Sequence, residues 1–307
     1  MKIFFKLIIS ATLLYLVFRY TNFRDVSSSV FSYSLQVIVS VSIFQFLALV
    51  VAALKWKFFL QEHSFLRLFR FTLVGQFYSL VLPGQISGEI AKAYRFSKGE
   101  EKKERLVASV AMDKITGIAG LLLVAVVGML CTSTELLGNW KAAIIIALVV
   151  VLASIFSFRF GSVRSLTVKY LPFSHVFLPF IDAYHEYAKN TALIVLTTLL
   201  GALFQLLAVW ITIILAHSLG INISVFDWFW IFSLVSVAVF VPITIGGLGI
   251  REGVFVGLLG FFAVPPAEAV ALSLSVFALQ VLAGAVGGIL EVWHLFGSHD
   301  KIKMNAK

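Results

Sequence analysis

Six long apolar runs dominate the sequence and restrict the folds open to it. They cover residues 2–20, 35–56, 105–131, 141–158, 191–215 and 269–295. As helices, runs of about 18 residues or more span or nearly span the roughly 30 Å hydrocarbon core of a bilayer. Backbone polar groups find no water in that core, so such runs must satisfy their own hydrogen bonds as helices. With 60% hydrophobic and 13% charged residues, the sequence predicts an all-α, polytopic membrane protein.

The segment 226–262 is apolar but interrupted by residues that a membrane helix tolerates poorly. Its halves, residues 226–241 and 250–262, reach only about 24 Å and about 20 Å as helices, which is short of a full crossing. Between them, Pro242 lacks a backbone N–H, and three glycines leave helical geometry easily. Two half-length helices that meet at a turn inside the membrane satisfy these constraints. Such re-entrant turns are typical of binding sites.

A second interrupted segment occupies residues 71–96. Its apolar part, residues 71–82, ends at Pro83 and Gly84, and the sequence becomes charged from Glu89 onward. The helix-breaking residues Pro83, Gly84 and Pro242 therefore predict two re-entrant helical hairpins in addition to about six full spans.

The distribution of lysine and arginine predicts the orientation. We place the amino terminus in the cytoplasm, let each full span cross once, and return each broken segment to its own side. Of the 24 Lys and Arg, 19 then lie inside and three outside, while Lys114 and Arg251 lie in membrane segments. This bias agrees with the positive-inside rule. We expect a multi-pass protein of the cytoplasmic (inner) membrane with both termini in the cytoplasm.

The same topology gives the two hairpins opposite orientations. The hairpin at residues 71–96 enters from the cytoplasm and the hairpin at 226–262 from outside. Residues 35–131 and 191–295 then form two inverted units, joined through a basic, aromatic cytoplasmic connection at 159–190. We expect a single transmembrane domain over residues 1–307, with an inverted repeat typical of transporters.

The composition argues against several other classes of function. The formal net charge of +9 arises mainly from cations in short connections, so membrane orientation explains it better than nucleic-acid binding. Cys131 is the single cysteine and cannot form an intramolecular disulfide. The six histidines lack metal-binding spacing. We expect no metal and no cofactor.

Polar residues after the first break allow two interpretations. Ser87 is placed to cap a helix that starts near Gly88, with Glu89 complementing the helix dipole. Alternatively, this helix start holds a lipid phosphate with help from Lys92 and Arg95. Those two cations also suit water or anionic head groups at the membrane surface.

Charges also occur inside predicted membrane segments. Asp113 and Lys114 lie two turns inside the span 105–131, where a charge costs about 2.5–3.5 kcal/mol. They either pair with charges on neighbouring helices and lock the bundle, or line a translocation path. Arg251 and Glu252 pose the same choice, and the guanidinium fork favours a phosphate ligand. Glu291 is expected to be structural. The candidate head-group ligands are Gln85, Ser87, Gly88, Glu89, Lys92, Arg95, Thr244, Gly246, Gly247, Gly249, Arg251 and Glu252.

The chain resembles the lysylphosphatidylglycerol synthase transmembrane-region family over nearly its whole length. The resemblance rests on three blocks: Leu82-Pro83-Gly84 with Gly88-Glu89 and Tyr94-Arg95; Arg105 with Asp113-Lys114 and Gly117; and Pro242 with Gly246-Gly247-Leu248-Gly249-Ile250-Arg251-Glu252. It implies a polytopic protein associated with flipping aminoacylated phospholipids or with handling polyprenyl-linked sugars. Many relatives carry a charged residue near Gln85 and Ser87, so the resemblance does not identify the head group here.

The leading hypothesis is a flippase-like lipid translocase, in which an anionic head group enters between the two re-entrant turns. The alternative is a membrane enzyme, or an enzyme subunit, in aminoacyl-phospholipid or lipid-linked glycan synthesis. The short outside loops and the 12 residues after Leu295 offer little room for a soluble catalytic domain. A scaffold role, a separate lipid-modifying enzyme as partner, and a homo-oligomer stay open. The sequence does not identify the lipid, the direction of transport or the energy source.

Overall fold

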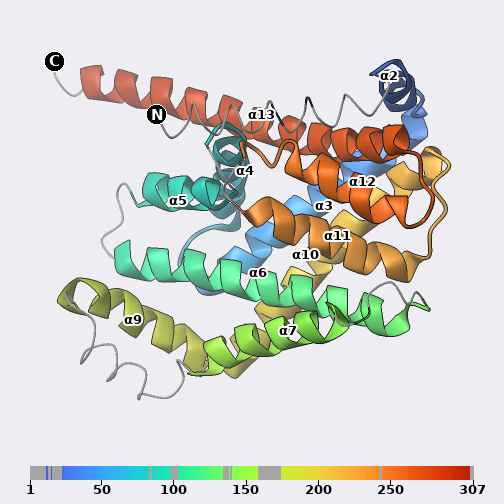
Figure 1. The fold of residues 1–307 in the computed structure, drawn as a ribbon. Helices are drawn as coiled ribbons and strands as arrows, with labels where there is room; N and C mark the ends of the chain where they lie inside the picture. The colour runs from blue at the N-terminus through green and yellow to red at the C-terminus, as the bar shows by residue number, and fades with distance from the viewer. Residues whose placement is uncertain are drawn as a thin grey trace. The chain divides into compact units, whose positions relative to one another are not determined.

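The computed structural model describes Thr12, Tyr15 and residues 23–82, 85–97, 103–133, 138, 140–157, 174–241 and 244–304. These residues form eleven helices and no strand (Figure 1), which confirms the predicted all-α class. The predicted first span, residues 2–20, lies outside the described residues except for Thr12 and Tyr15, which are helical. In chain order the helices are α2 (Phe23–Phe31), α3 (Leu35–Phe59), α4 (Phe65–Val81), α5 (Gln85–Phe96), α6 (Lys103–Cys131), α7 (Trp140–Ser157), α9 (Ser174–Lys189), α10 (Thr191–Ser218), α11 (Val225–Phe240), α12 (Ile250–Gly260) and α13 (Pro266–Met304).

Four of these helices are long and apolar enough to cross a membrane. They are α3, α6, α10 and the part of α13 from Pro266 to Trp293. They coincide with four of the predicted spans, so the chain is a multi-pass membrane protein. Helix α7 covers the predicted span 141–158 as far as Ser157, with 18 residues in all. Helix α9 occupies the second half of the predicted connection 159–190, and its first half lies outside the described residues.

Both interrupted segments are broken close to the predicted positions. The first break separates α4 from α5. The second separates α11, which ends at Phe240, from α12, which begins at Ile250. The predicted depth of these breaks in the membrane stays a prediction. The start of α4 is a correction, because the helix begins at Phe65 and not at Phe71. Arginine is a good helix former, and the helix includes Arg67 and Arg70 in almost two further turns at its amino-terminal end.

The helices assemble into two compact units that are interleaved along the sequence. Unit 1 consists of Met1–Ser32, Leu66–Arg95 and Val237–Lys307, and unit 2 of Tyr33–Phe65 and Phe96–Ser236. Unit 1 therefore holds α2, α12, α13 and most of α4 and α5, whereas unit 2 holds α3, α6, α7, α9, α10 and most of α11. The predicted inverted units follow each other in sequence, so the compact units do not reproduce them and the repeat stays a prediction.

Unit 2 is built on close contact between its long helices. A Cβ added to Gly120 of α6 would fall on the backbone of Gly201 and Ala202 in α10. The buried indole of Trp56 in α3 donates to the Ser109 hydroxyl of α6 at 3.2 Å. Glycine pairs of this kind let helix backbones approach closely, which is how membrane helices gain packing energy.

Unit 1 uses glycines in the same way on one face of α13. Cβ atoms added at Gly284, Gly287 and Gly288 would all meet α4, and at Gly287 the obstacle is the Leu73 backbone. Helices α12 and α13 run side by side, and α2 packs on α13 (Figure 1).

We expect Gly287→Ala to destabilise unit 1 by about 1–3 kcal/mol or more, because the added methyl group overlaps backbone that cannot rotate away. Thermal unfolding in detergent measures this effect. Gly257→Ala is the matched control, since a Cβ at Gly257 meets nothing within 4 Å. Equal unfolding midpoints for the two variants would contradict the predicted α4–α13 contact.

Candidate functional site

One face of α13 carries most of the polar contacts of unit 1. Ser273, Phe277, Gln280, Gly284 and Glu291 are separated by multiples of three or four residues and therefore share one side of the helix. From Ser273 to Glu291 this face extends about 27 Å, close to the thickness of the hydrocarbon core. It contacts Arg251 and Glu252, at the start of α12, through Gln280 and Ser273, and it contacts Arg95 of α5 through Glu291.

The turn before α12 requires its glycines. Gly246, Gly247 and Gly249 have φ values of 60°, 78° and 86°, which side chains other than glycine rarely adopt. A Cβ at Gly247 would also lie 2.5 Å from Val239. These angles confirm that the stretch leaves helical geometry. Pro242 lies outside the described residues, as do Pro83 and Gly84.

Arg251 is held by this turn and by α13. Its side chain is buried, with 3% of the residue exposed. Nη2 donates to the Gly246 carbonyl at 3.0 Å and to Gln280 Oε1 at 3.0 Å, and the guanidinium lies 5.1 Å from the Phe277 ring centroid. Nη1 is also buried, and it has no hydrogen-bond partner among the described residues. A buried cationic donor costs free energy when it makes no hydrogen bond, so this nitrogen is suited to an anionic ligand.

Glu252 stabilises the same turn. The residue is fully buried, and its carboxylate accepts from the Gly249 N–H at 2.5 Å and from the Ser273 hydroxyl at 2.9 Å. The first contact is half of a capping box at the start of α12. Glu252 therefore links the turn before α12 to α13, and it directly follows Arg251 in the sequence.

Thr244 and the end of α4 complete this site. Thr244 is 1% exposed, and its hydroxyl has no hydrogen-bond partner among the described residues. A Cβ at Gly246 would lie 4.0 Å from the carbonyl oxygen of Leu80, one residue before α4 ends at Val81. The two interrupted segments thus come together in unit 1. We call Thr244, Gly246, Gly247, Gly249, Arg251 and Glu252 the glycine-turn site.

The cations of α5 are paired with carboxylates. Lys92 Nζ lies 2.5 Å from Glu89 Oε2, and Lys92 is 4% exposed. Arg95 forms an ion pair with Glu291 of α13, and the Tyr78 hydroxyl of α4 donates to Glu291 Oε1 at 3.0 Å. Of the interpretations that the sequence left open for these two cations, exposure to water does not fit the buried Lys92, and the Arg95 side chain is 15% exposed.

The start of α5 corrects one sequence prediction. The helix begins at Gln85, so Ser87 lies in its first turn and not before it, and Glu89 falls in the second turn. A helix can start earlier than its best capping residue because the first N–H groups need no partner within the helix. Gly88 has a packing role instead, since a Cβ there would meet Ser79 and the Gly75 carbonyl of α4.

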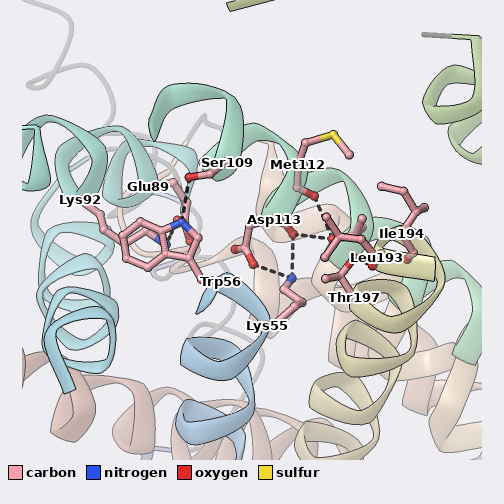
Figure 2. A network of polar contacts seen from close by, with 11 residues as sticks. Lys55, Trp56, Glu89, Lys92, Ser109, Met112, Asp113, Leu193, Ile194 and Thr197 are labelled. Carbon is pink, nitrogen blue, oxygen red and sulfur yellow. Dashed lines mark hydrogen bonds and ion pairs between the residues drawn. The ribbon is translucent and has the colours of Figure 1, made fainter. Parts of the chain in front are cut away.

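The second set of buried charges lies in unit 2. Lys55 Nζ of α3 donates to the Asp113 carbonyl at 2.7 Å and lies 3.3 Å from Asp113 Oδ1 (Figure 2). The prediction that Asp113 is compensated by a charge on a neighbouring helix is confirmed. Lys114 follows Asp113 and is half-buried. Lys55 is buried, with 8% of the residue exposed.

Several site residues were not predicted. Ser273, Gln280 and Tyr78 are uncharged, and their roles depend on contacts that join residues 21, 29 and 213 positions apart. Glu291, which was expected to be structural, bonds to Arg95 and Tyr78. The three-or-four-residue spacing of Ser273, Gln280 and Glu291 on one apolar span was the available signal.

Comparison with protein families supports the membrane character of this arrangement. The family model described as "Lysylphosphatidylglycerol synthase TM region" matches residues 3–288. The chain belongs to this family. A search of the curated proteins and of the solved structures found no match. Membership in the lysylphosphatidylglycerol synthase TM region family indicates a membrane protein related to lipid modification or translocation.

Proposed function

We propose that this chain is a lipid translocase of the cytoplasmic membrane, and that the glycine-turn site binds the phosphate of an anionic lipid. Aminoacylated phospholipids and polyprenyl-phosphate-linked sugars are two substrate classes that carry such a phosphate. In this proposal both termini are cytoplasmic, the two interrupted segments are re-entrant hairpins, and the lipid tail stays in the bilayer.

The proposal rests on the burial and the incomplete hydrogen bonding of Arg251. A buried guanidinium uses one nitrogen to bind its own turn and leaves Nη1 without a partner in the described residues. The same turn contains the buried Thr244 hydroxyl, also without a partner there, and opens helix α12. A phosphate supplies several acceptor oxygens to such donors, and the positive end of the helix dipole favours its charge.

The paired cations of α5 supply a second place for the same head group. Lys92 and Arg95 are neutralised by Glu89 and Glu291. A phosphate that replaced either carboxylate would keep the local charge balanced. In this scheme the carboxylates and the lipid phosphate take turns as partners, so the cations are never left unpaired in the membrane. Gln85 and Ser87, at the start of α5, are retained as proposed neighbours of this head group.

Native mass spectrometry after gentle extraction tests whether the protein binds such a lipid. We expect a phosphate-bearing lipid to copurify with the native protein and to be depleted in Arg251→Ala. Loss of a charge-assisted hydrogen bond of about 1.5–3 kcal/mol would reduce occupancy roughly ten- to a hundredfold.

Arg67→Ala serves as the matched control, because Arg67 is an exposed arginine of the same unit. Both variants must show the unfolding midpoint of a folded protein before their lipids are compared. Equal lipid occupancy in the native protein, Arg251→Ala and Arg67→Ala would exclude Arg251 as the phosphate ligand. A native protein free of phosphate-bearing lipid would favour the enzyme-subunit or scaffold alternatives.

A further inference from the structure

The buried cations of this chain differ in the kind of partner that they have. Lys55 and Lys92, which are 8% and 4% exposed, each form an ion pair with a carboxylate. Arg251 is 3% exposed, and the described groups that contact its guanidinium are uncharged: a backbone carbonyl, the Gln280 amide and an aromatic ring. A buried charge costs free energy unless it is paired. Arg251 therefore has a glutamine where the two lysines have an acidic residue.

Glu252 follows Arg251 directly but does not take the place of that acidic partner. Its carboxylate oxygens accept from the Gly249 N–H and from the Ser273 hydroxyl. Within the described residues, no ion pair joins Glu252 to Arg251. The carboxylate is thus bound to the turn and to α13, while Arg251 Nη1 stays without a hydrogen-bond partner in this part of the chain.

Gln280 and Phe277 orient the guanidinium from one face of α13. They are three residues apart and therefore lie on the same side of the helix. The Phe277 ring centroid is 5.1 Å from the guanidinium carbon of Arg251, and Gln280 Oε1 accepts from Nη2 at 3.0 Å. Nη2 carries two hydrogens, and the Gly246 carbonyl accepts the other one. Gln280 thus completes the hydrogen bonding of Nη2 and helps to fix the fork, so that Nη1 is left for a ligand.

The Gln280 amide also has a second polar atom near the same place. Its oxygen must face Arg251, because a guanidinium donates hydrogen bonds and accepts none. Its nitrogen, Nε2, donates to none of the described residues. Since Oε1 and Nε2 share one carbon atom, the bond to Arg251 also holds Nε2 close to the guanidinium. An N–H donor in this position suits a phosphate oxygen, whereas a carboxylate would compete with phosphate for Arg251.

We propose that Gln280 is a specificity-determining residue of the glycine-turn site, which orients Arg251 and donates a hydrogen bond to the same phosphate. This role rests on the phosphate site proposed above. A neutral amide holds the guanidinium in position without neutralising it, so the lipid phosphate supplies the balancing charge. A carboxylate in place of the amide would supply that charge itself and exclude the lipid.

Two variants of nearly the same shape separate charge from hydrogen bonding. Gln280→Glu keeps an acceptor for Arg251 and adds a negative charge, whereas Gln280→Met removes both polar atoms and keeps the length of the side chain. Native mass spectrometry of protein freed of copurified lipid and titrated with phosphatidylglycerol measures the half-saturating lipid concentration. Thermal unfolding of the same samples measures stability. Gln36→Glu is the control, because it adds the same charge to an exposed glutamine of α3.

We expect Gln280→Glu to raise the half-saturating concentration about ten- to a hundredfold. Its unfolding midpoint should equal or exceed that of the native protein, because the new carboxylate pairs with Arg251. Gln280→Met is expected to raise the half-saturating concentration about two- to tenfold, the equivalent of one uncharged hydrogen bond. Gln36→Glu should leave it unchanged.

A purely structural role for Gln280 predicts a different pattern, since a variant that keeps the bond to Arg251 would then keep its lipid affinity. Native affinity in Gln280→Glu or in Gln280→Met would overturn the proposal. A loss of affinity that occurs only together with a lower unfolding midpoint would overturn it as well.

Arg251→Ala, titrated in parallel, distinguishes the failure of this proposal from the failure of the phosphate site. If Arg251→Ala loses affinity while both Gln280 variants keep it, the phosphate site stands and Gln280 does not determine its specificity. If Arg251→Ala binds phosphatidylglycerol with native affinity, the phosphate site is excluded, and the role of Gln280 is excluded with it.

Discussion

Replacing Lys55 by methionine is expected to lower the free energy of unfolding by about 3–5 kcal/mol, one of the two largest effects predicted for this protein. The ammonium and its carboxylate partner have side chains only 10% and 12% exposed. Removing the lysine leaves the Asp113 carboxylate buried without its ion-pair partner. It also removes the 2.7 Å bond to the Asp113 carbonyl. Unfolding in mixed detergent micelles measures the loss.

A double-mutant cycle separates this pairing from simple loss of volume. Asp113→Asn is expected to be destabilising as well, but the double variant Lys55→Met with Asp113→Asn should recover much of the loss, because neither charge is then stranded. Lys57→Met provides the control, since the Lys57 ammonium donates to the Gln61 and His63 backbone carbonyls. Strictly additive losses in the cycle would show that Lys55 and Asp113 contribute independently.

Arg251 is expected to give the largest effect on lipid movement. Arg251→Lys keeps the positive charge but loses the planar fork that binds Gly246 and Gln280 and leaves Nη1 for a ligand. We expect head-group exchange to slow about ten- to a hundredfold, the rate equivalent of about 1.5–3 kcal/mol. Arg251→Ala should slow it at least as much. The accessibility of a fluorescent phosphatidylglycerol in proteoliposomes measures both variants.

The helices of this protein could be predicted from the sequence where they depend on residues close together in the chain. Hydrophobic length predicted α3, α6, α10 and α13, because a bilayer leaves a long apolar run no alternative to a helix. The break between α11 and α12 was predicted by Pro242 and three glycines, and the glycines do adopt positive φ values. Local charge was less reliable. The predicted segment begins at Phe71, but the helix also includes Arg67 and Arg70 and begins at Phe65.

Contacts between distant residues could not be predicted from one sequence. Nothing local in the sequence identifies Lys55 as the partner of Asp113, because the two residues are 58 positions apart. Gly88 was expected to begin a helix, yet its lack of a side chain serves the contact with α4. The partners of Arg251 and Arg95 on α13 could not be predicted either. Gln280 and Glu291 lie in an apolar span, and only tertiary packing brings them to the two arginines.

Head-group accessibility in proteoliposomes tests the translocase most directly. Dithionite bleaches a fluorescent phosphatidylglycerol in the outer leaflet, and movement from the inner leaflet appears as further bleaching in sealed vesicles. The native protein and Arg67→Lys are predicted to expose the inner-leaflet probe. Arg251→Lys, reconstituted at the same density and with a folded unfolding profile, is predicted to do so about ten- to a hundredfold more slowly. Equal rates in the native protein, Arg251→Lys and Arg251→Ala would contradict a phosphate site at Arg251, and a native rate equal to that of protein-free vesicles would contradict lipid translocation itself.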